Sequence, residues 1–356
     1  MPAPWLRTTA LAALLIGCDL GDRDDAPAQG PPLHLVAVTP AADEGLECTV
    51  DSPGDCGVVP DARIELRFDR FLDPATAAAE AVLVTYTGIS DAYVQMEAHY
   101  DLVERVLVLS LPLGHQWWRG IRYGVRILVP DDEGAFGLRA FDGAALSETG
   151  SVPLEWSFRV RWGDPEPRPE PPAKPTCADV RDRFARAGCQ SAVCHQPASL
   201  GNCPPGYARA DPDDDCVGVP RMGLDLSSSD GLLATAIDQV AHQAETGPGM
   251  GTPLENPDRF GVQMPVLDPG RPANSYLMYK LLRNRAIWSG SACESRFTVP
   301  LAGECPTPSQ AQLDRLREWF VRGEPMPPFG SGGLTRSDLE LVHSWISFGA
   351  PMQDCE

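Results

Sequence analysis

Lysine is nearly absent from this chain, and so is any surplus of positive charge. Only Lys174 and Lys280 are lysines among 29 basic residues, and 49 Asp and Glu residues bring the formal net charge to −20. A strongly acidic protein is repelled by nucleic-acid phosphates and by anionic lipid headgroups. The composition therefore argues against nucleic-acid partners and favours neutral or cationic ones.

Long apolar runs are also missing. The run at residues 9–16 is too short to span a bilayer as a helix and is typical of a secretory signal. It ends in Leu15-Ile16-Gly17-Cys18, which resembles the bacterial lipobox. The resemblance implies that residues 1–17 are a signal peptide and that lipid on Cys18 holds the chain to a membrane. We expect a cell-envelope lipoprotein, on the periplasmic face of a membrane or at the cell surface, with residues 18–32 as a flexible tether.

The strongest chemical signal is the stretch Cys189-Gln190-Ser191-Ala192-Val193-Cys194-His195. A Cys-x-x-Cys-His motif attaches c-type haem, and here four residues separate the cysteines instead of two. Each thiol can add across a haem vinyl group, and the histidine then becomes the proximal iron ligand. The motif predicts one covalent haem c and one-electron transfer. Alternatively, Cys189–Cys194 is a disulfide in a haem-free surface interaction or scaffold lipoprotein.

A second axial ligand is expected for an electron-transfer haem, and methionine is a common one. Met326 is the first candidate, because Pro325 and Pro327 flank it and would stiffen its loop. Met264 is the second candidate, and His343 or no protein ligand stay open. An open sixth position would fit a haem peroxidase, the one enzymatic alternative.

Other catalytic patterns are missing from the sequence. It contains no nucleophile–base pattern, no phosphate-binding loop and no dinucleotide fingerprint. We therefore predict an electron carrier that is not an enzyme, has no small-molecule substrate and exchanges electrons with an unidentified protein partner.

The cysteine count fits export into an oxidising compartment. Eleven cysteines are present, and an even number remains after Cys18 is assigned to lipid, whether or not two more hold haem. Proximity in the sequence suggests the disulfides Cys48–Cys56, Cys203–Cys216 and Cys293–Cys305, and leaves Cys177 with Cys355.

Residues 33–162 show the alternation of apolar and polar side chains that is typical of half-buried β-strands. Strand-like runs lie at residues 64–69, 82–87, 106–111, 125–129 and 156–160. Turns rich in Gly, Pro and Asp separate them, which predicts a β-sandwich.

This region resembles the bacterial Ig-like domains of S-layer and other surface proteins. The residues that carry the resemblance are Val38-Thr39-Pro40, Phe68-Asp69-Arg70-Phe71-Leu72-Asp73-Pro74, Tyr123-Gly124-Val125 and Trp156-Ser157-Phe158. The resemblance implies a spacer or interaction module without catalysis.

A proline-rich spacer at residues 163–175 separates this region from residues 176–356. The second region opens with Thr176 and Asp179 at capping-box spacing, and a helical pattern leads into Cys189. Near its end, two capped amphipathic helices repeat at an offset of 26 residues, as the match of Trp319 with Trp345 shows.

The second region resembles planctomycete-type cytochrome c domains. The resemblance rests on the Cys189–His195 motif, Gly223-Leu224-Asp225-Leu226-Ser227, the segment 269–277, Met326-Pro327-Pro328 and the closing segment 339–350. It implies covalent haem with His195 as the proximal and Met326 as the distal ligand. The expected fold is an all-β Ig-like sandwich at 33–162, followed by a mostly α, class I cytochrome c-like domain at 176–356.

Overall fold

The computed structural model describes most of the chain from residue 30 onward. The described residues are 30–46, 56–87, 92–130, 136–162, 173–190, 195, 199–200, 216–217, 223–241, 264–289, 295–301, 307–319, 321, 325–327 and 333–355. Several predicted cysteine sites lie outside them: Cys18, Cys48, Cys194, Cys203, Cys293 and Cys305. The proposed signal peptide and most of the spacer at 163–175 also lie outside the described residues.

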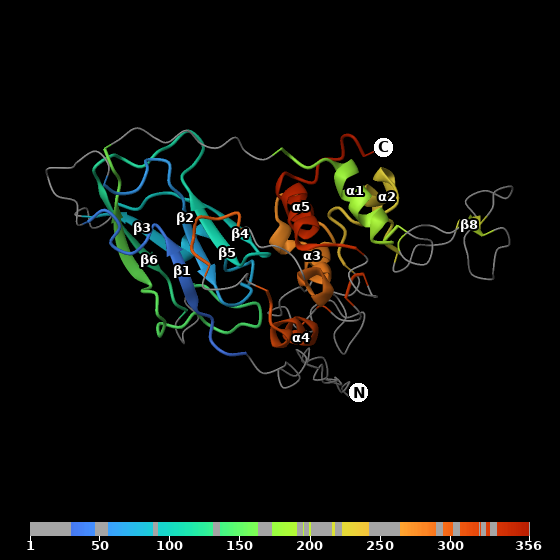
Figure 1. Cartoon of the computed structure of the whole chain (residues 1–356), viewed down its shortest axis with the longest axis horizontal. Helices are drawn as coiled ribbons and strands as arrows, with labels where there is room; N and C mark the ends of the chain where they lie inside the picture. The colour runs from blue at the N-terminus through green and yellow to red at the C-terminus, as the bar shows by residue number, and fades with distance from the viewer. Residues whose placement is uncertain are drawn as a thin grey trace, which may run out of the picture.

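Two antiparallel sheets make up the N-terminal region (Figure 1). The four-stranded sheet has the order β1-β2-β5-β4, and the three-stranded sheet has the order β3-β6-β7. The strands are β1 (Leu35–Thr39), β2 (Ile64–Phe68), β3 (Val82–Tyr86), β4 (Glu97–Asp101), β5 (Val106–Ser110), β6 (Arg122–Ile127) and β7 (Glu155–Arg159). A separate pair, β8 (Ser199–Leu200) and β9 (Cys216–Val217), forms a short ladder.

Alternating apolar side chains place the core between the two sheets. Val84 and Val125 are paired across β3 and β6, and both are about 1% exposed. They belong to the same buried cluster as Leu66 and Leu107 of the other sheet. Five strands lie within a few residues of the ranges expected from the period-two pattern, which confirms the two-sheet β architecture of this region.

Strand β2 differs from the half-buried strand that its alternating pattern predicts, because both of its faces are buried. Its charged side chains, Glu65 and Arg67, are 5% and 2% exposed. The segment 295–301 covers them: the backbone N–H groups of Thr298 and Val299 each donate to Glu65 Oε2 at 2.8 Å. A distant part of the chain therefore provides the second cover of the sheet.

The prediction of a second, mostly α, class I cytochrome c-like domain is wrong. Within the described residues there are five short α-helices beside the sheets, and no clear separate helical domain. They are α1 (Cys177–Arg186), α2 (Ser229–Thr235), α3 (Tyr276–Leu282), α4 (Gln310–Trp319) and α5 (Arg336–Ser347). Left-handed glycines such as Gly188 and Gly349 end α1 and α5 after about three turns.

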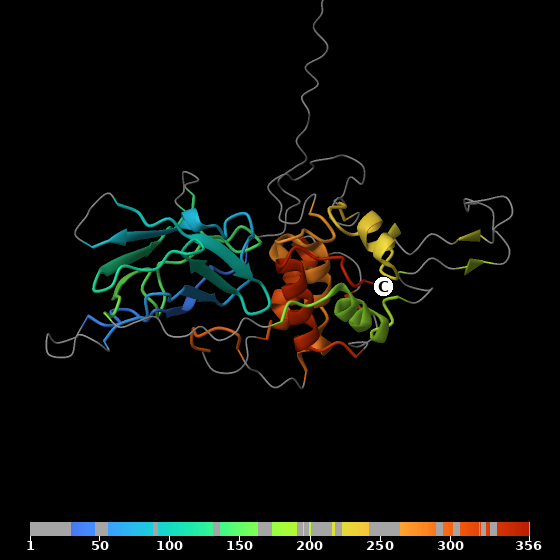
Figure 2. The ribbon, with the colours of Figure 1, turned by 90° about the horizontal axis from the view of Figure 1, so that it is seen from above.

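The helices also share their core with the sheets. Phe184 of α1, Leu281 of α3 and Trp345 of α5 belong to the same buried cluster as the strand residues. In both side and top views, α3 and α5 lie next to the sheets, with α1 and α2 farther out (Figures 1 and 2). The described parts of the two sequence regions are therefore packed together.

A buried network of charged side chains connects the sheets with the helical region. The Glu104 carboxylate, fully buried, accepts hydrogen bonds from Arg67 at 3.2 Å, from Ser295 Oγ at 2.6 Å and from the Arg296 backbone N–H at 2.9 Å. Arg336 at the start of α5 lies 3.6 Å from the same carboxylate. One acidic side chain of the β region thus contacts three segments of the chain.

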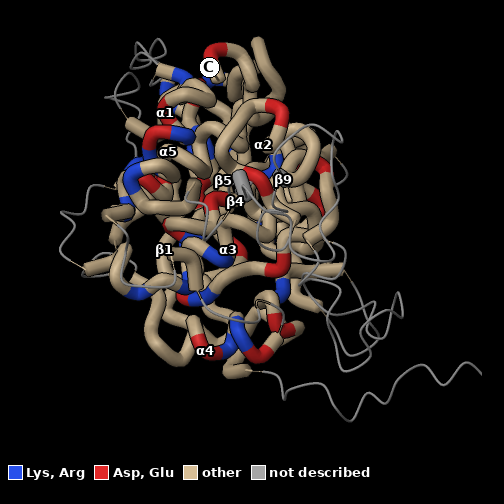
Figure 3. Tube along the Cα trace, turned by 90° about the vertical axis from the view of Figure 1, so that its right-hand side faces the viewer, with Lys and Arg blue, Asp and Glu red and all other residues tan. Residues whose placement is uncertain are grey.

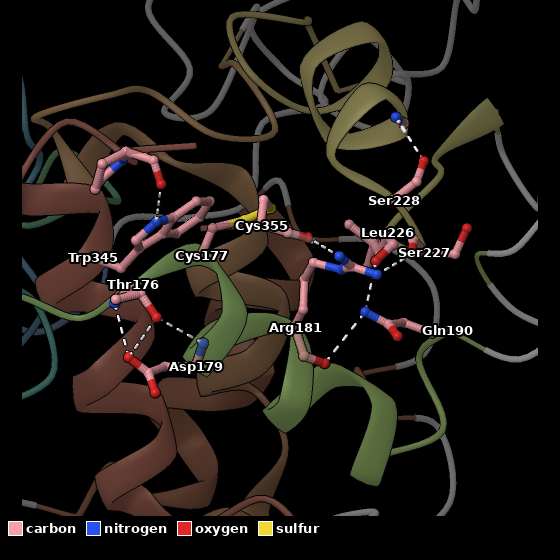
Figure 4. Close-up of a disulfide and its surroundings, with 12 residues drawn as sticks. Thr176, Cys177, Asp179, Arg181, Gln190, Leu226, Ser227, Ser228, Trp345 and Cys355 are labelled. Atoms are coloured by element: carbon pink, nitrogen blue, oxygen red, sulfur yellow. Dashed lines mark hydrogen bonds between the residues drawn. A yellow bond between two sulfur atoms is a disulfide. The ribbon is translucent and has the colours of Figure 1, made fainter. Parts of the chain in front are cut away.

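A disulfide joins the two ends of the helical region, between the two cysteines that remained after the others were paired by sequence proximity. Cys177 at the start of α1 is bonded to Cys355, 178 residues later, with Cα atoms 4.7 Å apart (Figure 4). The predicted capping box is also present, because Asp179 N–H donates to Thr176 Oγ1 and the Asp179 carboxylate accepts from the Thr176 N–H. Cys56 is disulfide-bonded as well.

Candidate functional site

The end of α1 places the first cysteine of the motif. Gly188 adopts a φ of +74°, and Cys189 N–H then donates to Phe184 O at 2.9 Å, closing the helix. The Cys189 carbonyl in turn accepts the His195 N–H at 3.1 Å. This hydrogen bond brings the two ends of the motif together, and Cys189 and His195 are both buried.

The segment 224–227 contacts Gln190 and His195 and orients the histidine. Leu226 N–H donates to His195 O at 2.9 Å, and the Leu224 carbonyl lies 3.2 Å from His195 Nδ1. A carbonyl only accepts, so this contact requires the proton on Nδ1, the tautomer whose Nε2 lone pair can bind a metal. Gln190 donates to Leu226 O and to Arg181 O, which ties the motif to α1 (Figure 4).

His195 and Met326 line the same cavity, which has a volume of about 240 Å³. Its wall is mostly apolar. The described lining residues are His195, Gly223, Leu224, Ala234, Thr235, Gln239, Val240, Ala241, Val266, Tyr276, Leu277, Lys280 and Met326. The structure therefore brings together the two side chains that the sequence nominated as axial ligands.

Helix α3 holds the methionine loop against the cavity. Met326 N–H donates to Lys280 O at 3.1 Å, and the Asn284 side-chain amide donates to Pro327 O at 2.8 Å. Asn284 Oδ1 also accepts from Ala286 N–H at 3.0 Å. Because all seven residues of α3 are buried, the loop is attached to a firmly packed element.

The other ligand candidates lie elsewhere. Met264 is 4% exposed and does not appear among the described cavity-lining residues. His343 lies on α5, where its ring packs edge-on against His99 with centroids 5.7 Å apart. Burial is the main cause that lowers the pKa of His343 to about 4, so this side chain is neutral at neutral pH.

Neutral His343 lies 3.8 Å from Asp101 Oδ2, too far for a hydrogen bond. Burial by itself would raise the pKa of Asp101. The positive charge of His343 in its protonated form, Arg296 and the Glu104 N–H outweigh burial and hold that pKa below its usual value. His343, Asp101 and Arg296 belong to the buried contact between the β region and α5, and none of them is among the described lining residues of the cavity.

Two residues at the site were missed by the motif analysis. Lys280 was counted only as a rare lysine, although its place in the apolar run Tyr-Leu-Met-Tyr-Lys-Leu-Leu is unusual. Asn284 had no signal in the sequence, since its role depends on the position of Pro327, far along the chain.

Replacing Asn284 by aspartate tests the attachment of the methionine loop. The variant keeps the acceptor for Ala286 N–H but removes the donor to Pro327 O, which leaves a buried carbonyl unpaired. We expect the free energy of unfolding to fall by about 1–3 kcal/mol, measured by urea denaturation. A change below about 0.5 kcal/mol would show that the bond does not hold the loop.

Within the described residues, no cluster of three or more His, Cys, Asp or Glu side chains is arranged to hold a metal ion. No helix in that part of the chain is long and apolar enough to cross a membrane. Acidic and basic residues are interspersed along the helices at this end of the molecule (Figure 3). Among the described residues, the candidate ligands His195 and Met326 lie together in the wall of the cavity.

Comparison with known proteins finds no matching family model and no matching curated protein. The solved S-layer protein rSbsC(31-844) is similar at 15% identity over 39% of this chain and 14% of that chain, with a TM-score of 0.24. CopC from Methylosinus trichosporium OB3b is similar at 17% identity over 39% of this chain and 99% of that chain, with a TM-score of 0.21. This chain therefore spans only a small part of the S-layer protein, and similarity at this level assigns neither family nor function.

Proposed function

We propose that this chain is a cell-envelope protein that binds one haem covalently and transfers single electrons. The observation that carries the proposal is the cavity in which His195 and Met326 meet, although they are far apart in the sequence. The proposal depends on these donors and not on the cytochrome c-like fold, which the described residues do not form.

The donor set fits haem. Cys189 and, from the sequence, Cys194 would hold it by thioether bonds, while the His195 imidazole and the Met326 thioether would bind the iron. Bound haem supplies an iron that alternates between Fe(II) and Fe(III). The Leu224 carbonyl fixes the histidine tautomer, and α3 fixes the methionine loop.

The size of the cavity has a consequence for this function. Its volume of about 240 Å³ is below the roughly 300–1,000 Å³ of typical ligand pockets. A haem held by these donors would be only partly enclosed by the described residues. Outer-sphere electron transfer to a partner protein needs part of the haem to be accessible.

A second candidate function is a haem-free interaction or scaffold protein of the cell surface. The β-rich architecture of the described residues, without a clear separate helical domain, favours it. In that case Cys189–Cys194 would be a disulfide. In both candidates, lipid on Cys18 would hold the chain to a membrane.

Intact mass separates the two candidates. The chain is expressed together with a c-type haem maturation system, and its cysteine-to-serine variant at Cys189 and Cys194 serves as the control. Covalent haem is expected to add about 616 Da to the wild-type chain only, whereas a disulfide removes about 2 Da. Absence of the added mass contradicts the haem proposal. Acyl groups on Cys18 are read from the same spectrum of membrane-extracted protein.

A further inference from the structure

A second hollow, with a volume of about 320 Å³, lies at the loop that contains Met326. Pro325 and Pro327 line this hollow, whereas Met326, between them, lines the cavity described above. The other walls come from the residues that follow α3, from the short 3-10 helix Arg285–Trp288 and from α4. The same loop therefore contributes to both hollows.

The wall of the second hollow has the opposite charge from the chain as a whole. Arg283, Arg285 and Arg317 line it, and we call it the arginine pocket. Asp314 is the one carboxylate among its described lining residues. Arg283 is half-buried and donates to the Val321 carbonyl, which holds its side chain in place. In a chain with a formal net charge of −20, this wall is a local site of positive potential.

Two of the three arginines can reach a ligand from solvent. Arg285 and Arg317 are both exposed, and in the part of the chain that the structure describes neither forms an ion pair with a carboxylate. Arg285 donates to Gln310 Oε1 at 3.4 Å, and the Gln310 amide donates to Asp314 Oδ1 at 2.8 Å. Gln310 thus stands between Arg285 and the carboxylate of the pocket. A guanidinium has five N–H donors, so Arg285 keeps donors for a ligand.

The charge pattern indicates the chemistry of the ligand. Guanidinium groups bind carboxylates through two parallel hydrogen bonds, a geometry that lysine cannot match. Because the chain as a whole is strongly acidic, a long polyanion such as a nucleic acid would be repelled wherever it extends beyond the pocket. A short acidic segment of a protein can place its carboxylates against the arginines and avoid that repulsion.

We propose that the arginine pocket is a docking site for a short acidic segment of a partner protein, which Arg285 and Arg317 bind. This inference goes beyond the proposed haem function and does not depend on it. In an electron carrier, a partner docked here would lie beside the loop that contains the candidate ligand Met326.

The test uses a fluorescently labelled hexaglutamate peptide, with labelled hexaglutamine as the uncharged control. Each peptide is titrated with the full chain at low ionic strength, and binding is followed by fluorescence anisotropy. We expect the wild type to bind hexaglutamate at least about tenfold more tightly than hexaglutamine, and added salt to weaken this preference. The double variant Arg285→Gln/Arg317→Gln should lose most of the preference. Arg285→Lys/Arg317→Lys should keep part of it, because the charges remain.

A matched variant controls for net charge. Arg126 and Arg271 are exposed and are not among the described residues of the pocket wall. Arg126→Gln/Arg271→Gln removes the same two charges and should bind hexaglutamate as the wild type does. Equal weakening in this variant and in the pocket variant would show general charge attraction and overturn the docking site. Far-UV circular dichroism verifies that the variants are folded.

Two further outcomes would contradict the proposal. The first is equal affinity of the wild type for the two peptides. The second is binding of labelled hexathymidylate as tight as that of hexaglutamate, which would assign the pocket to phosphates. Because the readout is the label on the peptide, binding without covalent haem would overturn only the proposed function. Haem loading without peptide binding would overturn only the docking site.

Discussion

Replacing Glu104 by glutamine is expected to lower the free energy of unfolding by about 3–5 kcal/mol. The substitution keeps the size of the side chain but removes its charge. Arg67 and Arg336, which are 2% and 4% exposed, would lose their shared buried counter-charge. The loss is measured by urea denaturation. It should reduce protection from hydrogen exchange in β2 and in α5 together, because Glu104 contacts both.

Glu340→Gln is the matched control for this variant. Glu340 also pairs with Arg336, at 2.9 Å, but its side chain is 18% exposed. Pairs nearer to solvent contribute less, so we expect a loss below about 1 kcal/mol. Equal effects of the two variants, or lost protection in β2 alone, would contradict the view that Glu104 joins the β region to α5.

Removing the Cys177–Cys355 disulfide is the second change with a large expected effect. The bond closes a loop with a sequence separation of 178. For a loop of this length, chain-entropy arguments give a stabilisation of roughly 5 kcal/mol. The double variant Cys177→Ser/Cys355→Ser should therefore unfold at a much lower urea concentration than the wild type. Covalent haem loading should fall as well, because α1 leads directly to Cys189.

The control for this variant is Cys48→Ser/Cys56→Ser. Sequence proximity pairs these residues across a short loop, for which the same argument gives about 2.5 kcal/mol. A loss in the Cys177/Cys355 variant no larger than in this control would show that the buried contacts already hold the ends of the helical region together. Intact mass confirms that no other disulfide has formed in either variant.

Local patterns in the sequence predicted the local structure well. The alternation around Ile64 and Val84 located strands to within a few residues, and the capping-box spacing located the start of α1 at Cys177. These signals succeed because neighbouring residues determine them. Strand β4 was not predicted, since Glu97-Ala98-His99-Tyr100-Asp101 has little apolar character and pairs only because β5 lies beside it.

Contacts between distant segments could not be predicted. Glu65 and Arg67 alternate with apolar residues and were assigned to a solvent-facing side of β2, yet residues near 298 cover them. The helical spacing after Thr176 and in the second of the two repeated helices, which is α5, was correct. That spacing does not say whether the helices pack around a core of their own or onto the sheets, and the fold prediction failed at this point.

The candidate site shows the same division. His195 and Met326 were predicted as ligands because a cysteine–histidine motif and a proline-flanked methionine can be recognised in the sequence alone. Lys280 and Asn284 depend on the fold, because their hydrogen bonds to the loop that contains Met326 form only when α3 lies beside it. The candidate ligands could therefore be predicted from short sequence motifs. The residues that support them could not.

The disulfide between Cys177 and Cys355 also sets the path of mechanical force. If the β region and residue 355 are pulled apart, tension passes from residue 177 across the sulfur–sulfur bond to residue 355. The 177 residues between the two cysteines, which include the cavity lining, lie outside this shortest covalent path and are loaded only through their contacts with the β region. Reduction of this one bond would bring all of them into the covalent path of the force.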